Sequence, residues 1–278
     1  MTCQVFVGED ISSNYQKYRF RAPDEVRDTV LQFLDEKYIN ISRRQSHVLA
    51  VDLGCGTGQT TRLLAPHFQE VVGIDVSETQ LEQARAVLSC PDITYRKGTA
   101  EDLPFPDGSV DLITASSAAH YFDESKFMAE ANRVLKPGGC IALIDFPLQK
   151  MRLHYRDCGE RLTDIFHQML EVLMVDTSIP VVKSENMLED FFSAISFPDK
   201  QRAEGILEKS TTSVRKVLGS VKTSSMFQIY KGKDAQRAEE LFLDTQKRLL
   251  QEMKATSPDT EIEWTLEYYC VMASKPKQ

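Results

Sequence analysis

Short apolar runs alternate with amphipathic stretches over the first half of the chain, a pattern typical of strands alternating with helices. The runs that predict strands cover residues 47–52, 70–75, 93–96, 110–115 and 140–144. Two of the intervening helices follow capping residues, Ser77 and Asp123. Because strands and helices alternate so regularly, we expect an α/β fold with a doubly wound, mostly parallel sheet.

After residue 146 the pattern changes to longer helical stretches, at 151–176, 185–195, 213–230 and 234–254. Two further candidate strands, 204–211 and 262–273, bring the predicted sheet to seven strands. We therefore expect a single domain with a helical cap insertion. Its four expected parts are an N-terminal arm and helix (1–46), a ligand-binding core (47–146), a helical cap (147–255) and a closing strand (256–278).

Charge and composition narrow the range of partners. The 278 residues carry a net charge of -8, which argues against nucleic acid as the main partner. Six cysteines form no C-x-x-C pair and no metal-ligand spacing, so we expect no metal site. No apolar run approaches the ~20 residues of a membrane span, and the N-terminus lacks a secretory pattern. We expect a cytoplasmic protein; the sequence carries no signal of its oligomeric state.

Three glycines, Gly54, Gly56 and Gly58, follow the first strand at every second position. Glycine permits a tight turn and lets a ligand lie against the backbone, and the helix that follows directs free N–H groups at it. The spacing differs from the dinucleotide pattern G-x-G-x-x-G, and no Gly-Lys-Ser/Thr follows to bind a triphosphate. The loop therefore favours a nucleoside ligand without a pyrophosphate, the alternative being a turn that binds nothing.

Polar residues follow the next three strands of the predicted sheet. Asp75 ends the second strand, where its two oxygens suit the hydroxyls of a ribose. Ala100 and Glu101 follow the third strand and are expected near a base, and Ser116 and Ser117 follow the fourth. Ligands of such sheets bind at the carboxyl ends of the strands, so these residues are expected to share one site. The alternatives are a solvated surface aspartate and serines that only cap the backbone.

Four stretches in this order resemble the class I S-adenosylmethionine-dependent methyltransferases, namely VDLGCGTGQTT (51–61), GIDVS (73–77), GTAEDLPFPDGSVDLI (98–113) and RVLKPGG (133–139). The resemblance implies their Rossmann-like fold, S-adenosyl-L-methionine as methyl donor and S-adenosyl-L-homocysteine as product. It implies that the three glycines flank the methionine part, that Asp52 supports its ammonium, that Asp75 holds the ribose, and that Ala100 and Glu101 bracket the adenine. The expected cofactor-binding residues are Asp52, Gly54, Cys55, Gly56, Gly58, Asp75, Val76, Ala100, Glu101, Ser116 and Ser117.

Residues 118–123 (AAHYFD) and Tyr15-x-x-Tyr18-Arg19 resemble the trans-aconitate methyltransferase-like branch, which has a methyltransferase type 11 domain. Tyr121 departs from that branch, where a tryptophan is usual. This second resemblance implies a small-molecule acceptor, with carboxylic acids among the substrates of the branch.

The acceptor decides whether a base is needed. A carboxylate is already ionised near neutral pH, whereas a hydroxyl or an ammonium must lose a proton, for which His120 is the best-placed residue. The alternative is that His120 packs against the cofactor without transferring a proton. Candidate catalytic residues are His120 and Tyr121, and candidate substrate-binding residues are Tyr15, Tyr18, Arg19, Arg152 and Arg156. The arginines are included because guanidinium pairs with carboxylate in bidentate fashion.

The leading hypothesis is therefore an S-adenosylmethionine-dependent methyltransferase with a small-molecule acceptor. A cofactor-binding regulatory protein without catalysis and a protein methyltransferase are the alternatives. A nicotinamide oxidoreductase is disfavoured by the glycine spacing.

Overall fold

The parallel part of the sheet is built from the apolar runs of the first half. The computed structural model describes residues 22–38, 47–87, 92–177 and 187–277. Its strands β1 (His47–Leu53), β2 (Phe68–Asp75), β3 (Ile93–Lys97), β4 (Val110–Ser116) and β5 (Leu135–Asp145) lie side by side in the order β3-β2-β1-β4-β5, all parallel. The chain leaves β1 towards β2 on one side and returns to β4 on the other. The strand order therefore reverses between β1 and β4.

Both faces of this sheet are covered, which explains why its strands are apolar throughout. One face, with Ala50 and Leu112, packs with α2 (Asp24–Tyr38). The opposite face, with Val51 and Ile113, packs with α5 (Glu124–Val134) and α7 (Met187–Ala194). Neighbouring residues of a strand point to opposite faces, so each strand contributes to both hydrophobic clusters.

Short helices connect the strands on the way. They are α3 (Gln59–Leu64), η2 (Ala65–His67), α4 (Glu78–Ala86), η3 (Ala119–Tyr121) and η4 (Leu148–Lys150). The predicted caps are confirmed, since Ser77 accepts a hydrogen bond from the backbone N–H of Gln80 and Asp123 accepts one from Lys126.

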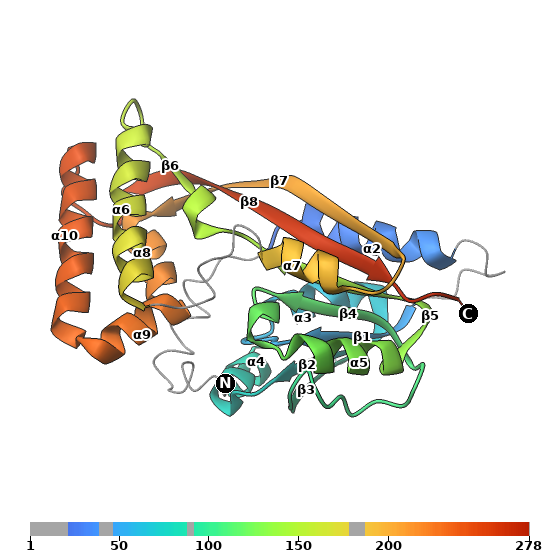
Figure 1. The fold of residues 1–278 in the computed structure, drawn as a ribbon. Helices are drawn as coiled ribbons and strands as arrows, with labels where there is room; N and C mark the ends of the chain where they lie inside the picture. Colours follow the sequence, from blue (N-terminus) through green and yellow to red (C-terminus); the bar gives the residue numbers. More distant parts are fainter. Residues whose placement is uncertain (1–21, 39–46, 88–91, 178–186, 278) are drawn as a thin grey trace.

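The second half adds two long strands and a group of helices. β8 (Glu261–Ser274) runs antiparallel to β5 and carries β7 (Asp199–Ser213) on its other edge. Figure 1 shows β7 and β8 extending from the sheet to four helices, α6 (Gly159–Thr177), α8 (Val214–Lys222), α9 (Ser225–Lys233) and α10 (Ala235–Met253). Within the described helices, none is both long and apolar enough to cross a membrane.

Two of the predicted boundaries in this half are wrong for identifiable reasons. The helix expected from residue 151 begins at Gly159, because β6 (Arg152–His154) pairs with β8. The single helix expected over 213–230 is divided, because the Ser224 hydroxyl accepts a hydrogen bond from Phe227 N–H and starts α9. The predicted fold class is confirmed, and the short β6 raises the sheet from the expected seven strands to eight.

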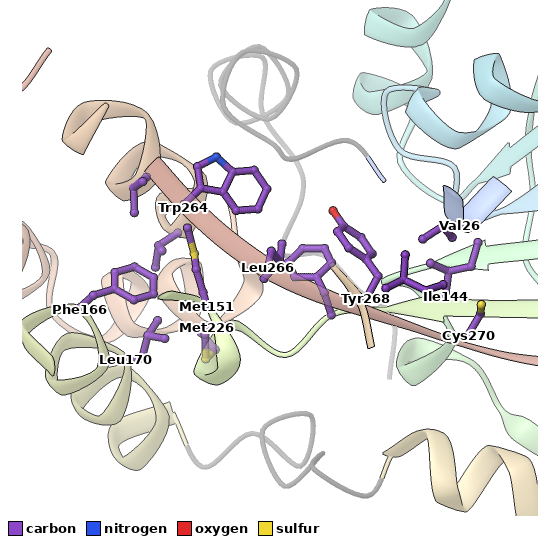
Figure 2. Packing of buried hydrophobic residues seen from close by; sticks show 14 of the residues in the cluster. Val26, Ile144, Met151, Phe166, Leu170, Met226, Trp264, Leu266, Tyr268 and Cys270 are labelled. Carbon is purple, nitrogen blue, oxygen red and sulfur yellow. The ribbon is translucent and has the colours of Figure 1, made fainter. Parts of the chain in front are cut away.

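One face of β8 joins the helices to the sheet. Trp264, Leu266, Tyr268 and Cys270 occupy every second position and are at most 4% exposed. Figure 2 shows Tyr268 and Cys270 beside Ile144 of β5, and Trp264 near Met151 and Phe166 at the other end of the strand. A continuous hydrophobic cluster therefore runs from the sheet into the group of helices and includes β8.

Candidate functional site

A pocket opens at the carboxyl ends of β1 and β4, where the strand order reverses. Parallel strands place their carboxyl ends at the same sheet edge, and the divergence of the connections leaves a crevice there. The empty volume is about 440 Å³, including solvent at the mouth. The pocket is lined by Ala22, Asp52, Gly54, Cys55, Gln59, Thr60, Ser116, Ser117, Phe146 and Tyr268.

The glycine loop forms one wall with its backbone. Gly54, Gly56 and Gly58 have φ angles of 61°, 54° and 79°, in the left-handed region that other residues rarely adopt. A Cβ atom on Gly54 would lie 2.4 Å from the Cβ of Ala118, and one on Gly58 would lie 2.1 Å from the hydroxyl oxygen of Tyr95. Two of the three positions therefore require glycine for both backbone conformation and space.

Asp52 lies beneath this loop and is 1% exposed. Its Oδ2 accepts a hydrogen bond from the Thr61 hydroxyl at 2.7 Å, and its Oδ1 accepts one from the Thr114 hydroxyl at 2.8 Å. Burial outweighs these two hydrogen bonds and raises the pKa of Asp52 to about 6. The two hydroxyls therefore fix the carboxylate in place from both of its oxygens.

Asp75, at the end of β2, connects the glycine loop to α4. Its Oδ2 accepts the backbone N–H of Gly56 and its Oδ1 accepts the backbone N–H of Ser77, both at 2.8 Å. Burial raises the pKa of Asp75. The next residue, Val76, is 47% exposed and presents an apolar surface beside this carboxylate.

The loop after β3 is tied to the segment that follows β4. Ala100 is buried, and Glu101 Oε1 accepts a hydrogen bond from the Asp123 backbone N–H at 2.9 Å. This bond brings together two segments 22 residues apart that sequence reasoning had assigned to the same site.

A polar cluster lies where β4 and β5 end. Ser117 has a left-handed φ of 51°, and its hydroxyl donates to Asp145 Oδ1 at 2.9 Å. Asp145 Oδ2 lies 3.7 Å from His120 Nδ1, and the His120 ring lies 4.1 Å from the Tyr121 ring, centroid to centroid. The two candidate catalytic residues are thus adjacent to a carboxylate whose orientation could not be read from the sequence.

Sequence reasoning missed two aromatic residues that line the pocket, Phe146 and Tyr268. Their ring centroids are 5.1 Å apart. Phe146 directly follows β5, so its place at a strand end was an available signal. Tyr268 lies in the middle of antiparallel β8, whose register against β5 no local pattern gives. The same applies to Ala22, Gln59 and Thr60, which carry no distinctive chemistry.

The candidate substrate-binding residues are placed differently. Arg152 and Arg156 are exposed and do not line the pocket, and the Arg156 guanidinium lies 5.1 Å from the centre of the Tyr155 ring. Tyr15, Tyr18 and Arg19 lie outside the described residues. Among the described residues that line the pocket, none is cationic.

Part of the chain is similar in sequence to known methyltransferases. Residues 51–143 match the family model described as a methyltransferase domain. Over 141 residues the chain is 35% identical to a candidate methyltransferase of Dictyostelium discoideum, covering 51% of this chain and 49% of that protein. It is 33% identical over 132 residues to a 27-O-demethylrifamycin SV methyltransferase of Amycolatopsis mediterranei, covering 45% of this chain and 48% of that protein. The chain spans about half the length or less of the curated relatives it matches.

The fold has a solved counterpart over nearly its whole length. A candidate type II methyltransferase of Anaeromyxobacter dehalogenans superposes with a TM-score of 0.69 at 23% identity, covering 93% of this chain and 99% of that chain. This likeness extends through the helical second half, which the family model does not reach. Residues 51–143 thus match a methyltransferase domain, and the described residues have a Rossmann-like class I methyltransferase fold.

Proposed function

We propose that this protein is an S-adenosylmethionine-dependent methyltransferase that acts on a small-molecule acceptor. The observation that carries the proposal is the pocket at the switch between β1 and β4, lined by Asp52, Gly54, Cys55, Ser116 and Ser117 within the matched methyltransferase domain.

The residues around the pocket fit S-adenosylmethionine. At Gly54 a side chain would collide with Ala118, so the backbone itself forms the wall against which the methionine part would lie. Asp52, held in place by the Thr61 and Thr114 hydroxyls, would support its ammonium. The cofactor, when bound, supplies a methyl group on a sulfonium whose thioether is an excellent leaving group.

Asp75 and its neighbours suit the nucleoside end. The Asp75 carboxylate is held by the backbone N–H groups of Gly56 and Ser77, and its two oxygens are acceptors of the kind that ribose hydroxyls need. Val76 offers an exposed apolar surface for one face of the adenine, and Ala100 and Glu101 would bracket the ring from the β3 loop. Gly56 and Gly58 then serve the turn that brings these groups together.

The acceptor is assigned to the other half of the chain. In this proposal residues 47–146 bind the cofactor, while 147–255 and the arm with Tyr15, Tyr18 and Arg19 bind the acceptor. The resemblance to the trans-aconitate methyltransferase-like branch supports a small-molecule acceptor, with carboxylic acids included. The relative named for 27-O-demethylrifamycin SV also supports a small molecule. The cysteines within the described residues, Cys55, Cys140, Cys158 and Cys270, are buried and free, which supports a reducing compartment such as the cytoplasm.

Transfer of a labelled methyl group tests the proposal. The protein would be incubated with methyl-labelled S-adenosylmethionine and a panel of carboxylic acids, alcohols, phenols, amines and a protein extract. We expect label in at least one small molecule and none with Asp75→Ala. Label in protein alone would favour a protein methyltransferase, and cofactor binding without transfer would favour the regulatory alternative. Base hydrolysis that releases labelled methanol would identify a carboxylate acceptor.

A further inference from the structure

Asp145 has one oxygen occupied and one directed at His120. Its Oδ1 accepts two hydrogen bonds, from the Ser117 hydroxyl at 2.9 Å and from its neighbour's backbone, Phe146 N–H, at 2.8 Å. Its Oδ2 lies 3.7 Å from Nδ1 of His120, a ring nitrogen that is buried and makes no hydrogen bond within the described residues. The His120 and Asp145 side chains are only 11% and 14% exposed. A small rotation of the ring would therefore complete a hydrogen bond in a water-poor environment.

The local backbone holds this carboxylate in position. Ser117 adopts a left-handed φ of 51°, which is uncommon for a residue with a Cβ. Its backbone N–H donates to the carbonyl of Ile144 at 2.8 Å while its hydroxyl donates to Asp145. Both bonds join the end of β4 to the end of β5, and Ser117 itself lines the pocket. Strain of this kind is characteristic of sites where a side chain must be held in one direction.

We propose that Asp145 is a positioning residue that keeps the proton of neutral His120 on Nδ1, leaving the Nε2 lone pair to take a proton from the methyl acceptor. The inference rests on the proposed function and narrows its substrate class to molecules whose accepting oxygen or nitrogen carries a proton. Hydrogen bonds of catalytic groups are often long before substrate binds and shorten in the complex, so the 3.7 Å separation suits such a pair.

The pocket lining agrees with this class of acceptor. It combines two aromatic rings, Phe146 and Tyr268, with serine hydroxyls, and its described part has no cation to neutralise a carboxylate. The charged side chain in the described lining, Asp52, is a carboxylate and offers an anion no partner. A hydroxyl or amine acceptor brings no negative charge, but it needs a base, which a carboxylate does not.

The proposed step is balanced without another reagent. A lone pair on the acceptor oxygen or nitrogen forms the bond to the methyl carbon as the carbon–sulfur bond breaks, and that bonding pair remains on sulfur. The acceptor proton moves to His120 Nε2, and the resulting imidazolium keeps its Nδ1–H towards Asp145. The charge that develops on the ring is therefore stabilised by the carboxylate, as in other histidine–aspartate pairs.

Nitrogen NMR of histidine-labelled, cofactor-free protein tests the assignment without any turnover. At about pH 9, where histidine rings are neutral, the ring ¹⁵N shifts distinguish Nδ1–H from Nε2–H. His120→Gln identifies the His120 signals, and His167, whose Nε2 contacts the carbonyl of Met151 at 2.9 Å, is the internal control. We expect Nδ1–H for His120 in the wild type. The Nε2–H form in the wild type would overturn the proposal.

Asp145→Asn provides the second arm. The amide oxygen would still accept from Ser117 and Phe146, which places the NH₂ group towards His120 Nδ1, so the ring should change to Nε2–H while His167 is unaffected. With an acceptor identified from the panel, kcat should fall 10²–10⁴-fold, the size of a general-base contribution, with the KM for S-adenosylmethionine unchanged. An unchanged kcat, or a tautomer identical to the wild type, would contradict the role of Asp145. If the wild type fails to bind S-adenosylhomocysteine, the proposed function fails. If it binds S-adenosylhomocysteine but His120 has the Nε2–H form, only the present proposal fails.

Discussion

Replacing Asp52 by asparagine tests how the buried carboxylate affects the stability of the cofactor-free protein. Asp52 is 1% exposed, and burial raises its pKa to about 6 from 3.8 in the unfolded chain. The folded protein therefore binds this proton more tightly than the unfolded chain does. The stabilisation from protonated Asp52 is complete below about pH 4 and is lost as the pH rises through about 6.

The magnitude follows from the two pKa values. The difference between about 6 and 3.8 means that the ionised Asp52 costs the fold about 3 kcal/mol at pH 8, because each pKa unit is about 1.4 kcal/mol. Asn removes this penalty, but only its amide oxygen accepts a hydrogen bond, so one of the Thr61 and Thr114 hydroxyls loses its acceptor, which costs about 1–2 kcal/mol. We expect the cofactor-free variant to be about 1–2 kcal/mol more stable than the wild type at pH 8, and about 1–2 kcal/mol less stable at pH 4.

Urea unfolding at both pH values measures this difference. Trp264 is the only tryptophan and is 4% exposed, so its fluorescence reports loss of the core. Asp164→Asn, at an exposed position of α6, is the control and should change the free energy of unfolding by less than about 0.5 kcal/mol at either pH. An Asp52→Asn variant less stable than the wild type by the same amount at pH 4 and pH 8 would refute the reasoning.

Two further variants test the packing of the glycine loop and of the sheet. Gly58→Ala should destabilise the protein by at least 2 kcal/mol more than Gly108→Ala in thermal unfolding. Both glycines have a left-handed φ, but of the two only Gly58 has a neighbour, Tyr95, within 3 Å of the added Cβ. Equal losses of stability would contradict the steric argument. Lys136→Met should cost about 3 kcal/mol in urea unfolding at pH 7, because it leaves buried Asp111 without a cation that contacts both its oxygens at 2.8 Å. Burial opposes the charge on Asp111, yet its hydrogen bonds hold the pKa of this carboxyl below the usual value. The loss of stability in Lys136→Met should therefore shrink below about pH 4. A loss that does not change with pH would exclude an ionic cause.

The cofactor half of the site could be predicted because its signals are local. Gly54 directly follows the apolar strand β1 and Asp75 is the last residue of β2, and parallel strands end at the same sheet edge. This topology brings the glycine loop close to Asp75, and the backbone N–H of Gly56 in that loop donates a hydrogen bond to Asp75. The family resemblance only had to add which ligand the edge would hold.

The acceptor half depended on pairings between distant residues. Tyr268 reaches the pocket only because β8 returns antiparallel beside β5, and Arg152 enters a strand rather than a helix because Thr265 pairs with it. Asp145 was recognisable as a strand end, but its direction depends on the Ser117 hydroxyl. No periodicity within either segment encodes these contacts, so the arginine clamp expected from the sequence has no described counterpart in the pocket lining.

Calorimetric titration with S-adenosylhomocysteine tests the central claim most directly, because it requires no knowledge of the acceptor. The wild type should bind one equivalent, and Asp75→Ala should weaken binding by about 100-fold or more, since it removes the two charged acceptors assigned to the ribose. Asp164→Ala, at an exposed position of α6, is the control and should bind S-adenosylhomocysteine as the wild type does. Circular dichroism should show that all three proteins are folded. Absence of binding by folded wild-type protein, or equal affinity in Asp75→Ala, would contradict the account.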